Sequence, residues 1–293
     1  MTRPDRLTGV PARVLLSTDL SARCDRALDR AVQLATEWGA ALTALKVIEP
    51  PQSPDHLLSW AAGDDDSSRV TIAHQQLMHD LEGTDVQADL RLGQGDVADA
   101  VERTANETDA GLVVTGMARN ETLGRFLLGS TVERLAGRLR RPLLVVRNRV
   151  RGPYQRIVLA TDFSDSSADA LRATMRLFPR HEVVLYHAYK LPLGGLSTRA
   201  AHEHGAPGDV QEEYQSFLAR LNLPDEARER LRLVTEHGAL ATVLTRYVRD
   251  HDVELVAMGA HGRRGLINAL LGSTASRLLH WLPCDTLIVV EPD

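Results

Sequence analysis

The stretch GAHGRRGLINALLGST, residues 259–274, places four glycines between an apolar run and a helical pattern. Because Gly259 and Gly262 have no Cβ, their backbone N–H groups can come within hydrogen-bonding distance of an anion. The Gly-Ser-Thr sequence that begins at Gly272 opens the next helix, where free N–H groups and the helix dipole favour a phosphate group. These residues predict a phosphate-binding loop, with a flexible connector and an ordinary helix cap as the alternative.

A carboxylate follows the first strand expected in the same half of the chain. Asp162 lies in the sequence ATDFS, directly after the apolar run near 156–161. In open α/β sheets, ligands bind outside the carboxyl ends of the strands, where the strand order reverses. If this strand neighbours the one before Gly259, the two border one crevice, and Asp162 binds a ribose or a base edge. The alternative is that Asp162 caps the following helix together with Ser164.

The sequence repeats itself at an offset of 143 residues. RVLLSTDLS in the first half aligns with RIVLATDFS in the second, and GSTVERL aligns with GSTASRL. The polar, arginine-rich stretch 147–156 between the copies contains a Gly-Pro pair and suits an exposed linker. We therefore expect two tandem domains, at residues 1–149 and 153–293.

Short apolar runs alternate with longer helical patterns in each copy, which fits parallel strands covered on both faces. The expected class is α/β, with two tandem doubly wound domains that each hold a five-stranded parallel sheet flanked by helices. Strands are expected near 13–18, 41–48, 85–92, 111–116 and 142–147, and again near 156–161, 181–188, 231–236, 253–258 and 285–290. Helices of the first copy are expected near 22–38, 68–82, 96–108 and 129–140. Long mobile loops are expected after the second strand of each copy, at 50–68 and 191–208.

The composition argues against several classes of protein. A formal net charge of −5 gives no reason to expect binding to nucleic acid or to an acidic membrane. No apolar run approaches the roughly 18 residues of a membrane span, so we expect a cytoplasmic protein. The only lysines, Lys46 and Lys190, do not follow a glycine, which excludes a GxxxxGK[ST] loop. Cys24 and Cys284 lack metal-ligand spacing and are expected to be free thiols.

No spacing of residues predicts a catalytic or metal centre. HEHG at 202–205 lacks the HExxH spacing of a zinc site, and DDD at 64–66 is interpreted as a solvated loop. No Ser-His-Asp or Cys-His arrangement is supported by spacing. His261, inside the glycine loop, is expected to face solvent, with a phosphate contact as the alternative.

The spacing Gly259-x-x-Gly262, nine residues, then Gly272-Ser273 resembles the nucleotide-binding signature of the universal stress protein family. The strands RIVLATDFS and TLIVV support this resemblance, which covers nearly the whole chain as two copies. It implies a Rossmann-like, adenine-nucleotide-hydrolase-like fold, and ATP, with or without Mg²⁺, as the ligand. In ATP-binding members, the first-strand Asp and the end of the second strand hold the adenosine, and the glycine loop holds the phosphates. The cofactor-binding residues this implies are Asp162, Ala188, Gly259, Gly262, Gly272, Ser273 and Thr274, with Ala188 smaller than the valine common in the family.

The first copy departs from this signature. Its loop GMARNETLGRFLLGST keeps Gly116, Gly129 and Ser130 but has Arg119 in place of the second glycine. A long side chain therefore stands where the backbone should approach phosphate, and it either bonds a phosphate oxygen or fills the site. We expect a weakened or empty first site. The positions that still match the adenosine contacts are Asp19 and Val47.

The resemblance leads to one main hypothesis and two alternatives. The main hypothesis is a stress-response or regulatory protein that binds ATP in its second domain. The alternatives are a structural or interaction module that binds no nucleotide, and a slow ATPase, although the chain lacks the Ser-Gly-Gly-x-Asp-Ser loop of nucleotide-cleaving relatives. The resemblance also implies an internal pseudo-dimer, joined through strands 142–146 and 286–290, and a homodimer of the whole chain.

Overall fold

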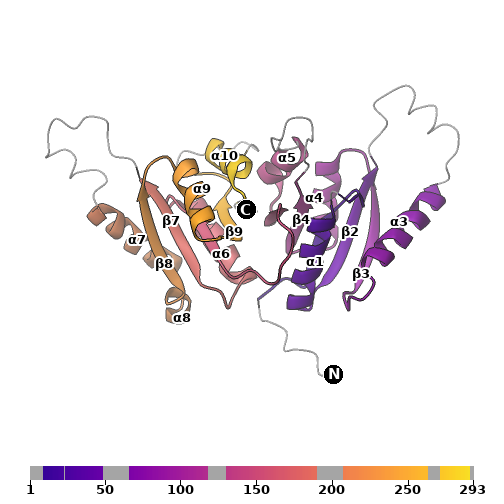
Figure 1. The fold of residues 1–293 in the computed structure, drawn as a ribbon, viewed down its shortest axis with the longest axis horizontal. Helices are drawn as coiled ribbons and strands as arrows, with labels where there is room; N and C mark the ends of the chain where they lie inside the picture. The colour runs from indigo at the N-terminus through magenta and orange to yellow at the C-terminus, as the bar shows by residue number, and fades with distance from the viewer. Residues whose placement is uncertain are drawn as a thin grey trace. The chain divides into compact units, whose positions relative to one another are not determined.

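The structure is a computed structural model, and Figure 1 traces its fold. The residues it describes are 9–22, 24–48, 66–117, 130–189, 207–262 and 271–290. The chain divides into two compact units. Unit 1 comprises residues 1–135 and 143–153, and unit 2 comprises residues 136–142 and 154–293.

Unit 1 holds five parallel strands in the order β3-β2-β1-β4-β5. The strands are β1 (Arg13–Ser17), β2 (Ala41–Ile48), β3 (Ala88–Gln94), β4 (Leu112–Gly116) and β5 (Leu143–Val146). The helices are α1 (Asp25–Trp38), α3 (Asp66–Asp80), α4 (Val97–Glu107) and α5 (Ser130–Arg138), of which residues 136–138 are counted in unit 2. The strand order reverses between β1 and β4. A ligand is therefore expected outside the carboxyl ends of these two strands.

Unit 2 repeats this topology, with the order β8-β7-β6-β9-β10 and all pairs parallel. Its first and fourth strands, β6 and β9, are therefore neighbours, as the sequence required for a shared crevice. The strands are β6 (Ile157–Ala160), β7 (Val183–Tyr189), β8 (Leu231–His237), β9 (Leu255–Gly259) and β10 (Asp285–Val289). The helices are α6 (Asp165–Leu177), α7 (Pro207–Leu221), α8 (Asp225–Arg228), α9 (Leu240–Asp250) and α10 (Ser273–Trp281).

The strands of unit 2 form the centre of its core. Leu159, Val256 and Leu287 are fully buried although they lie on three different strands. Helix α6 packs against β9 and β10, and its apolar side, which includes Leu171 and Leu177, is buried there. Continuous burial along the strands explains why they are apolar throughout and do not alternate with polar residues. The predicted fold class is confirmed.

Two elements of unit 1 differ from the prediction. The third strand runs from Ala88 to Gln94, three residues later than its predicted start at 85. Helix α1 begins at Asp25, three residues after the predicted start at 22. A turn occupies the gap, in which the Cys24 N–H donates to the Ser21 carbonyl at 2.8 Å. Most of the predicted loop residues, at 50–65 and 191–206, lie outside the described residues.

The second strand is where the offset between the copies changes. The Gly95 N–H donates to the Ile48 carbonyl at 3.2 Å, and the Gly238 N–H donates to the Tyr189 carbonyl at 2.9 Å. Ile48 and Tyr189 are therefore equivalent, and so are the residues before them, Val47 and Ala188. The offset is 141 residues here, although it is 143 at Gly95. The structural register thus aligns the two residues that the sequence assigned to the end of the second strand.

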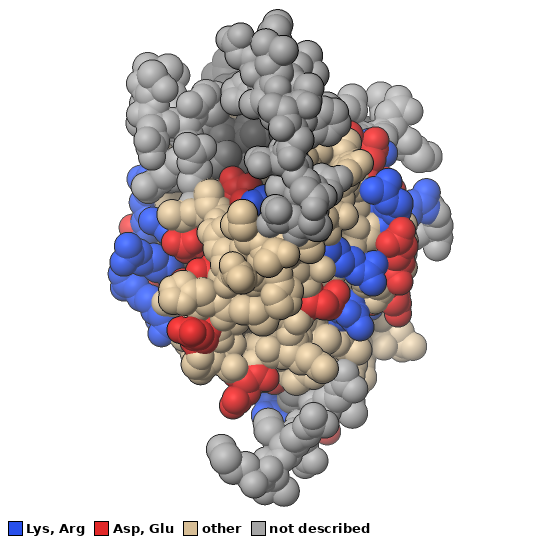
Figure 2. Space-filling view, turned by 90° about the vertical axis from the view of Figure 1, so that its right-hand side faces the viewer, with Lys and Arg blue, Asp and Glu red and all other residues tan. Residues whose placement is uncertain are grey.

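One face of the molecule carries charges of both signs. In Figure 2, basic and acidic side chains lie close to one another around an uncharged area. Among the described residues visible on this face, the charges do not form a continuous basic surface of the kind that binds a nucleic-acid backbone. Among the described residues, no helix is long and apolar enough to cross a membrane.

Candidate functional site

The turn after β6 is built by the side chains of the Thr-Asp-Phe-Ser sequence. The Thr161 hydroxyl accepts the Phe163 N–H at 2.9 Å, and Oδ1 of Asp162 accepts the Ser164 N–H at 3.1 Å. Phe163 has a φ of 60°, in the left-handed region, and its ring is buried in the core. Ser164 is the N-cap of α6 and accepts the N–H of Ser167 at 3.3 Å. Asp162 therefore shapes the turn, while the helix cap itself is Ser164.

Asp162 also borders the glycine loop. The Ser167 hydroxyl donates to Oδ1 of Asp162 at 2.9 Å, which fixes the carboxylate from the side of α6. The other oxygen, Oδ2, lies 2.9 Å from the place that a Cβ on Gly262 would occupy. Gly262 thus approaches the carboxylate so closely that a Cβ at this position would require the Asp162 side chain to shift. The structure brings these two residues together, as the sequence predicted for a shared crevice.

The other two glycines have close neighbours of their own. A Cβ on Gly259 would lie 2.3 Å from the Ser166 hydroxyl and 2.8 Å from the Ser166 carbonyl oxygen. Glycine is therefore required there so that the end of β9 can pack against α6. The Gly272 N–H donates to the Ala260 carbonyl at 2.9 Å, which joins the two ends of the loop. No φ in the left-handed range is found at these three glycines, so their common property is close approach.

A cavity of about 600 Å³ opens beside this loop. Its lining includes all seven residues that the sequence assigned to the site in unit 2: Asp162, Ala188, Gly259, Gly262, Gly272, Ser273 and Thr274. They come from the ends of β6, β7 and β9 and from the start of α10. His261, expected to face solvent, is half-buried and also lines the cavity.

Several lining residues were missed by the sequence analysis. They include Thr161 and Ser167 beside Asp162, Ala239 and Leu240 at the start of α9, and Arg277 on α10. Helix α9 packs against α10, so two helix N-termini meet at the cavity. Neither helix has an acidic residue in its first turn. The positive ends of both helix dipoles are thus left without nearby carboxylates, which favours an anionic ligand.

A polar network supports the strands behind the cavity. The Tyr186 hydroxyl donates to Glu236, which also forms an ion pair with Arg246. Burial raises the pKa of Tyr186 to about 12, so the hydroxyl keeps its proton at neutral pH. These contacts tie β7 and β8 to α9. They fix the backbone next to Ala188 and Gly238, two residues of the cavity wall.

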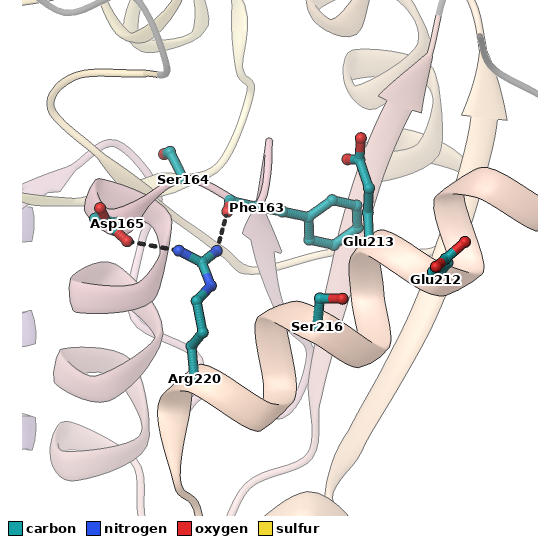
Figure 3. Close-up of a pocket in the computed structure, with 7 residues that line it drawn as sticks. All are labelled: Phe163, Ser164, Asp165, Glu212, Glu213, Ser216 and Arg220. Atoms are coloured by element: carbon teal, nitrogen blue, oxygen red, sulfur yellow. Dashed lines mark hydrogen bonds and ion pairs between the residues drawn. The ribbon is translucent and has the colours of Figure 1, made fainter. Parts of the chain in front are cut away.

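A second cavity, of about 690 Å³, lies on the α7 side of unit 2 (Figure 3). Arg220 of α7 donates to Oδ1 of Asp165 at 2.8 Å and to the Phe163 carbonyl at 2.7 Å, as the dashed lines show. Glu212 and Glu213 line the same cavity. Its arginine is therefore already paired and two carboxylates stand nearby, so the cavity does not suit an anion. Arg220 instead holds the turn that carries Asp162.

Unit 1 builds the same turn after β1. Oδ1 of Asp19 accepts the Ser21 N–H at 2.8 Å, and Leu20 has a φ of 59°. Burial raises the pKa of Asp19, but hydrogen bonds from Ser21 and Cys24 outweigh it and leave the pKa below its usual value. Gly116 ends β4, and Val47 lies near the end of β2. Of the remaining predicted residues, Arg119 and Gly129 lie outside the described residues, and Ser130 is described only as the first residue of α5.

Charged groups at the start of α4 and α5 distinguish unit 1. Asp96 is the N-cap of α4, accepts the Asp99 N–H at 3.1 Å and forms an ion pair with Arg134 of α5. The hydrogen bond from Arg134 holds the pKa of Asp96 below its usual value, so the carboxylate is charged at neutral pH. Asp99 and Glu133 lie in the first turns of α4 and α5. Carboxylates therefore stand where unit 2 has none.

The fold and the cavity define a tandem α/β protein with a glycine-lined cavity at the strand reversal of its second unit. The profile of the universal stress protein family matches residues 12–147 and again residues 153–290. A universal stress protein of Mycolicibacterium smegmatis is 26% identical over 307 aligned positions, which cover 94% of this chain and 96% of that protein. The chain therefore belongs to the universal stress protein family, as a member with two tandem domains.

Solved structures show the same fold over nearly the whole chain. A functionally unknown protein, PA1789 of Pseudomonas aeruginosa PAO1, superposes with a TM-score of 0.68 at 17% identity, covering 97% of this chain and 94% of that one. A universal stress protein from Archaeoglobus fulgidus DSM 4304 also gives a TM-score of 0.68, at 16% identity, covering 95% of this chain and 98% of that one. At these identities the likeness shows the tandem Rossmann-like fold.

Proposed function

We propose that unit 2 binds an adenine nucleotide, ATP, and that the protein acts in a stress response or its regulation through this bound state. The observation that carries the proposal is the cavity of about 600 Å³ lined by all seven predicted residues. In this proposal Asp162 and Ala188 contact the adenosine. The glycine loop and the start of α10 hold the phosphates through backbone N–H groups and hydroxyls.

The electrostatics of the cavity support an anionic ligand at one end. Two helix N-termini meet there, and no acidic residue occupies the first turn of either helix. Asp162 lines the cavity beside Gly262, and its carboxylate can accept a hydrogen bond from a ribose hydroxyl or a base amino group.

Mg²⁺ is proposed only as a companion of the nucleotide. Among the described residues, no group of three or more His, Cys, Asp or Glu side chains is arranged to hold a metal ion. Because Mg²⁺ commonly binds through substrate phosphates with few protein ligands, it would be carried by the ATP phosphates. Titrations with ATP in the presence and absence of Mg²⁺ measure this contribution.

The test is a calorimetric titration of the full chain with ATP, followed by hydrogen exchange of the free and saturated protein. We expect saturable binding, with protection of backbone amides at residues 259–262 and 272–278. These residues belong to unit 2, so the exchange data also distinguish it from unit 1. Absence of ATP binding, or protection confined to other residues, would contradict the proposal.

One observation favours the alternative, a module that binds no nucleotide. Gly259 is required by its contact with Ser166, and Gly272 lies against the Ala260 carbonyl, so both glycines have a role within the fold. Packing alone therefore accounts for these two positions. It accounts less well for Gly262, whose close neighbour is the Asp162 carboxylate in the wall of the cavity.

Three expectations stay predictions from the sequence. They are the pairing of the two domains through strands 142–146 and 286–290, a homodimer of the chain, and a cytoplasmic location. A chain truncated after Arg149 is expected to self-associate in light scattering, because it exposes an apolar strand edge. A stable monomer would count against the pairing. Slow ATP hydrolysis is tested by a turnover assay on the wild type and on Gly262→Asp. Hydrolysis by this protein should disappear in the variant, which is expected to lose ATP binding.

A further inference from the structure

Arg277 lies on α10, in the wall of the unit 2 cavity, with an exposed side chain. Its equivalent in unit 1, at the offset of 143 residues, is Arg134 on α5. The two helices have the same length and begin at equivalent residues, Ser130 and Ser273. The arginine is therefore at the same place in both units, and the difference between them is in what surrounds it.

In unit 1 this arginine is paired with a carboxylate. Arg134 forms an ion pair with Asp96, the N-cap of α4. The ion pair shows that an arginine side chain at position 134 of α5 is long enough to reach the N-cap of α4. A ligand phosphate that approached Arg134 would have to compete with a carboxylate already in contact with it.

In unit 2 the partner carboxylate is replaced by a methyl group. Ala239 is equivalent to Asp96 and is the N-cap of α9, with no side-chain cap hydrogen bond. Among the described residues, Arg277 has no hydrogen bond or ion pair to another side chain or to the backbone. Because Arg134 reaches Asp96 from the equivalent position, a guanidinium at Arg277 is long enough to reach the space in front of α9. That space is cavity, because Ala239 and Arg277 both line it.

We propose that Arg277 binds the phosphate groups of the nucleotide in unit 2, in the place that Asp96 takes beside Arg134 in unit 1. This inference rests on the proposed binding of an adenine nucleotide. A guanidinium suits the task because its fixed N–H groups match two oxygens of one phosphate, and its charge persists at every physiological pH. Arg277 should therefore increase the affinity for phosphorylated ligands and leave the affinity for adenosine unchanged.

The experiment is a calorimetric titration of the full chain with ATP and, separately, with adenosine. In Arg277→Gln we expect ATP affinity to fall about tenfold to a hundredfold, as for the loss of charge-assisted hydrogen bonds. Adenosine affinity should stay unchanged. Since the Arg277 side chain is exposed, the variant is expected to fold, and circular dichroism with thermal unfolding checks this.

A second variant rebuilds the unit 1 arrangement in unit 2. Ala239→Asp supplies the missing carboxylate and should lower ATP affinity at least as much as Arg277→Gln, because it pairs with Arg277 and repels phosphate. Ala239→Asn has the same size without the charge and should bind ATP nearly as the wild type does. Asp96→Ala, which changes unit 1 only, should leave ATP binding in unit 2 unchanged.

The possible results distinguish a failure of the Arg277 contact from a failure of nucleotide binding itself. If the wild type binds ATP and Arg277→Gln binds it equally well, the role of Arg277 is wrong and the proposed function stands. An equal loss of ATP and adenosine binding in Arg277→Gln would likewise overturn a phosphate contact, because it would indicate a structural effect. If the wild type binds neither ligand, the proposed function fails and this inference fails with it.

Discussion

Units 1 and 2 share one topology but differ in charge at the same three helix positions. The strand order is the same in both, and α4 and α5 have the same lengths as α9 and α10. The acidic residues of unit 1 and their neutral equivalents in unit 2 are Asp96 and Ala239, Asp99 and Thr242, and Glu133 and Ser276. The two copies thus retain the scaffold while the charge at the start of these helices has diverged. In the described residues, the first turns of these helices favour an anionic ligand more in unit 2 than in unit 1.

A second difference lies behind the cavity. Unit 2 has Tyr186 and Glu236 on neighbouring strands, where the structural register gives Leu45 and Gly93 in unit 1. Leu45 is buried among apolar neighbours, whereas Tyr186 donates to Glu236. The same pair of positions is therefore filled by packing in one unit and by hydrogen bonds in the other. The fold accepts both solutions because the backbone pairing is the same.

The largest expected effect comes from Gly262→Asp. A Cβ at this position would lie 2.9 Å from Oδ2 of Asp162, so the variant places a second carboxylate in the cavity beside the first. Repulsion between the carboxylates, and between them and phosphate, should reduce ATP affinity by about a hundredfold or more. Calorimetric titration measures the loss.

Two further variants at Gly262 separate the effect of the added atoms from the effect of the added charge. Gly262→Ala adds only the Cβ and should cost less ATP affinity than Gly262→Asp, because the Asp162 side chain can shift. Gly262→Arg copies Arg119 of unit 1 and tests whether an arginine there blocks the site or binds phosphate. ATP affinity in Gly262→Asp equal to that of the wild type would show that the ligand does not approach this loop.

A smaller effect, on stability, is expected at two equivalent glycines. Gly95 lies before α4 in unit 1, and Gly238 lies before α9 in unit 2. Gly238 has a φ of 144°, and a Cβ there would lie 2.6 Å from Cγ1 of Val243. Gly95 has a φ of 94° with nothing within 4 Å of the added atom. Gly238→Ala should therefore cost about 1–3 kcal/mol of unfolding free energy, and Gly95→Ala clearly less.

Denaturant unfolding measures the free energy of unfolding of both variants. Hydrogen exchange shows whether the lost stability is local to α9 or to α4. Because a chain with two compact units need not unfold in a single step, the local measurement is needed beside the global one. Equal costs for Gly238→Ala and Gly95→Ala would mean that the contact with Val243 relaxes without strain.

The smallest effect is expected from Tyr186→Phe, which removes the hydroxyl that donates to Glu236. The loss should be about 0.5–1.5 kcal/mol at neutral pH, as for one hydrogen bond. The pKa of Tyr186 is raised from 10.0 to about 12 by burial, so its contribution to stability is complete below pH 10 and is lost as the pH rises through about 12. The advantage of the wild type over Tyr186→Phe should shrink over that range in unfolding experiments. A constant advantage would contradict the raised pKa.

Sequence alone predicted the fold because the repeat supplies the same information twice. Apolar runs identified every strand, and the Thr-Asp and Gly-Ser-Thr sequences placed the cavity at the correct edge of the sheet. The difference between Asp96 and Ala239 is present in the aligned repeats, but no motif marks it, and the sequence does not show that Asp96 pairs with Arg134. That contact joins two helices 38 residues apart in the chain, and only the packed structure brings them together.

Other features of the site depend on packing that leaves no pattern in the sequence. The close approach of Gly259 to Ser166 arises from the way α6 crosses the end of β9. The support of the Asp162 turn by Arg220 depends on α7, which follows a stretch of sequence without regular spacing. Offsets between the copies also change within the domain, so the equivalence of Val47 and Ala188 required the strand register.

The nucleotide content of the purified protein tests whether one of the two similar units binds ATP. The full chain is denatured, the released nucleotide is identified by mass, and its molar ratio to the chain is measured, with subsequent ATP titration of the stripped and refolded protein. We predict one ATP per chain, lost in Gly262→Asp and retained in Asp96→Ala. Two ATP per chain would contradict the difference between the units, and no ATP in either measurement would contradict nucleotide binding altogether.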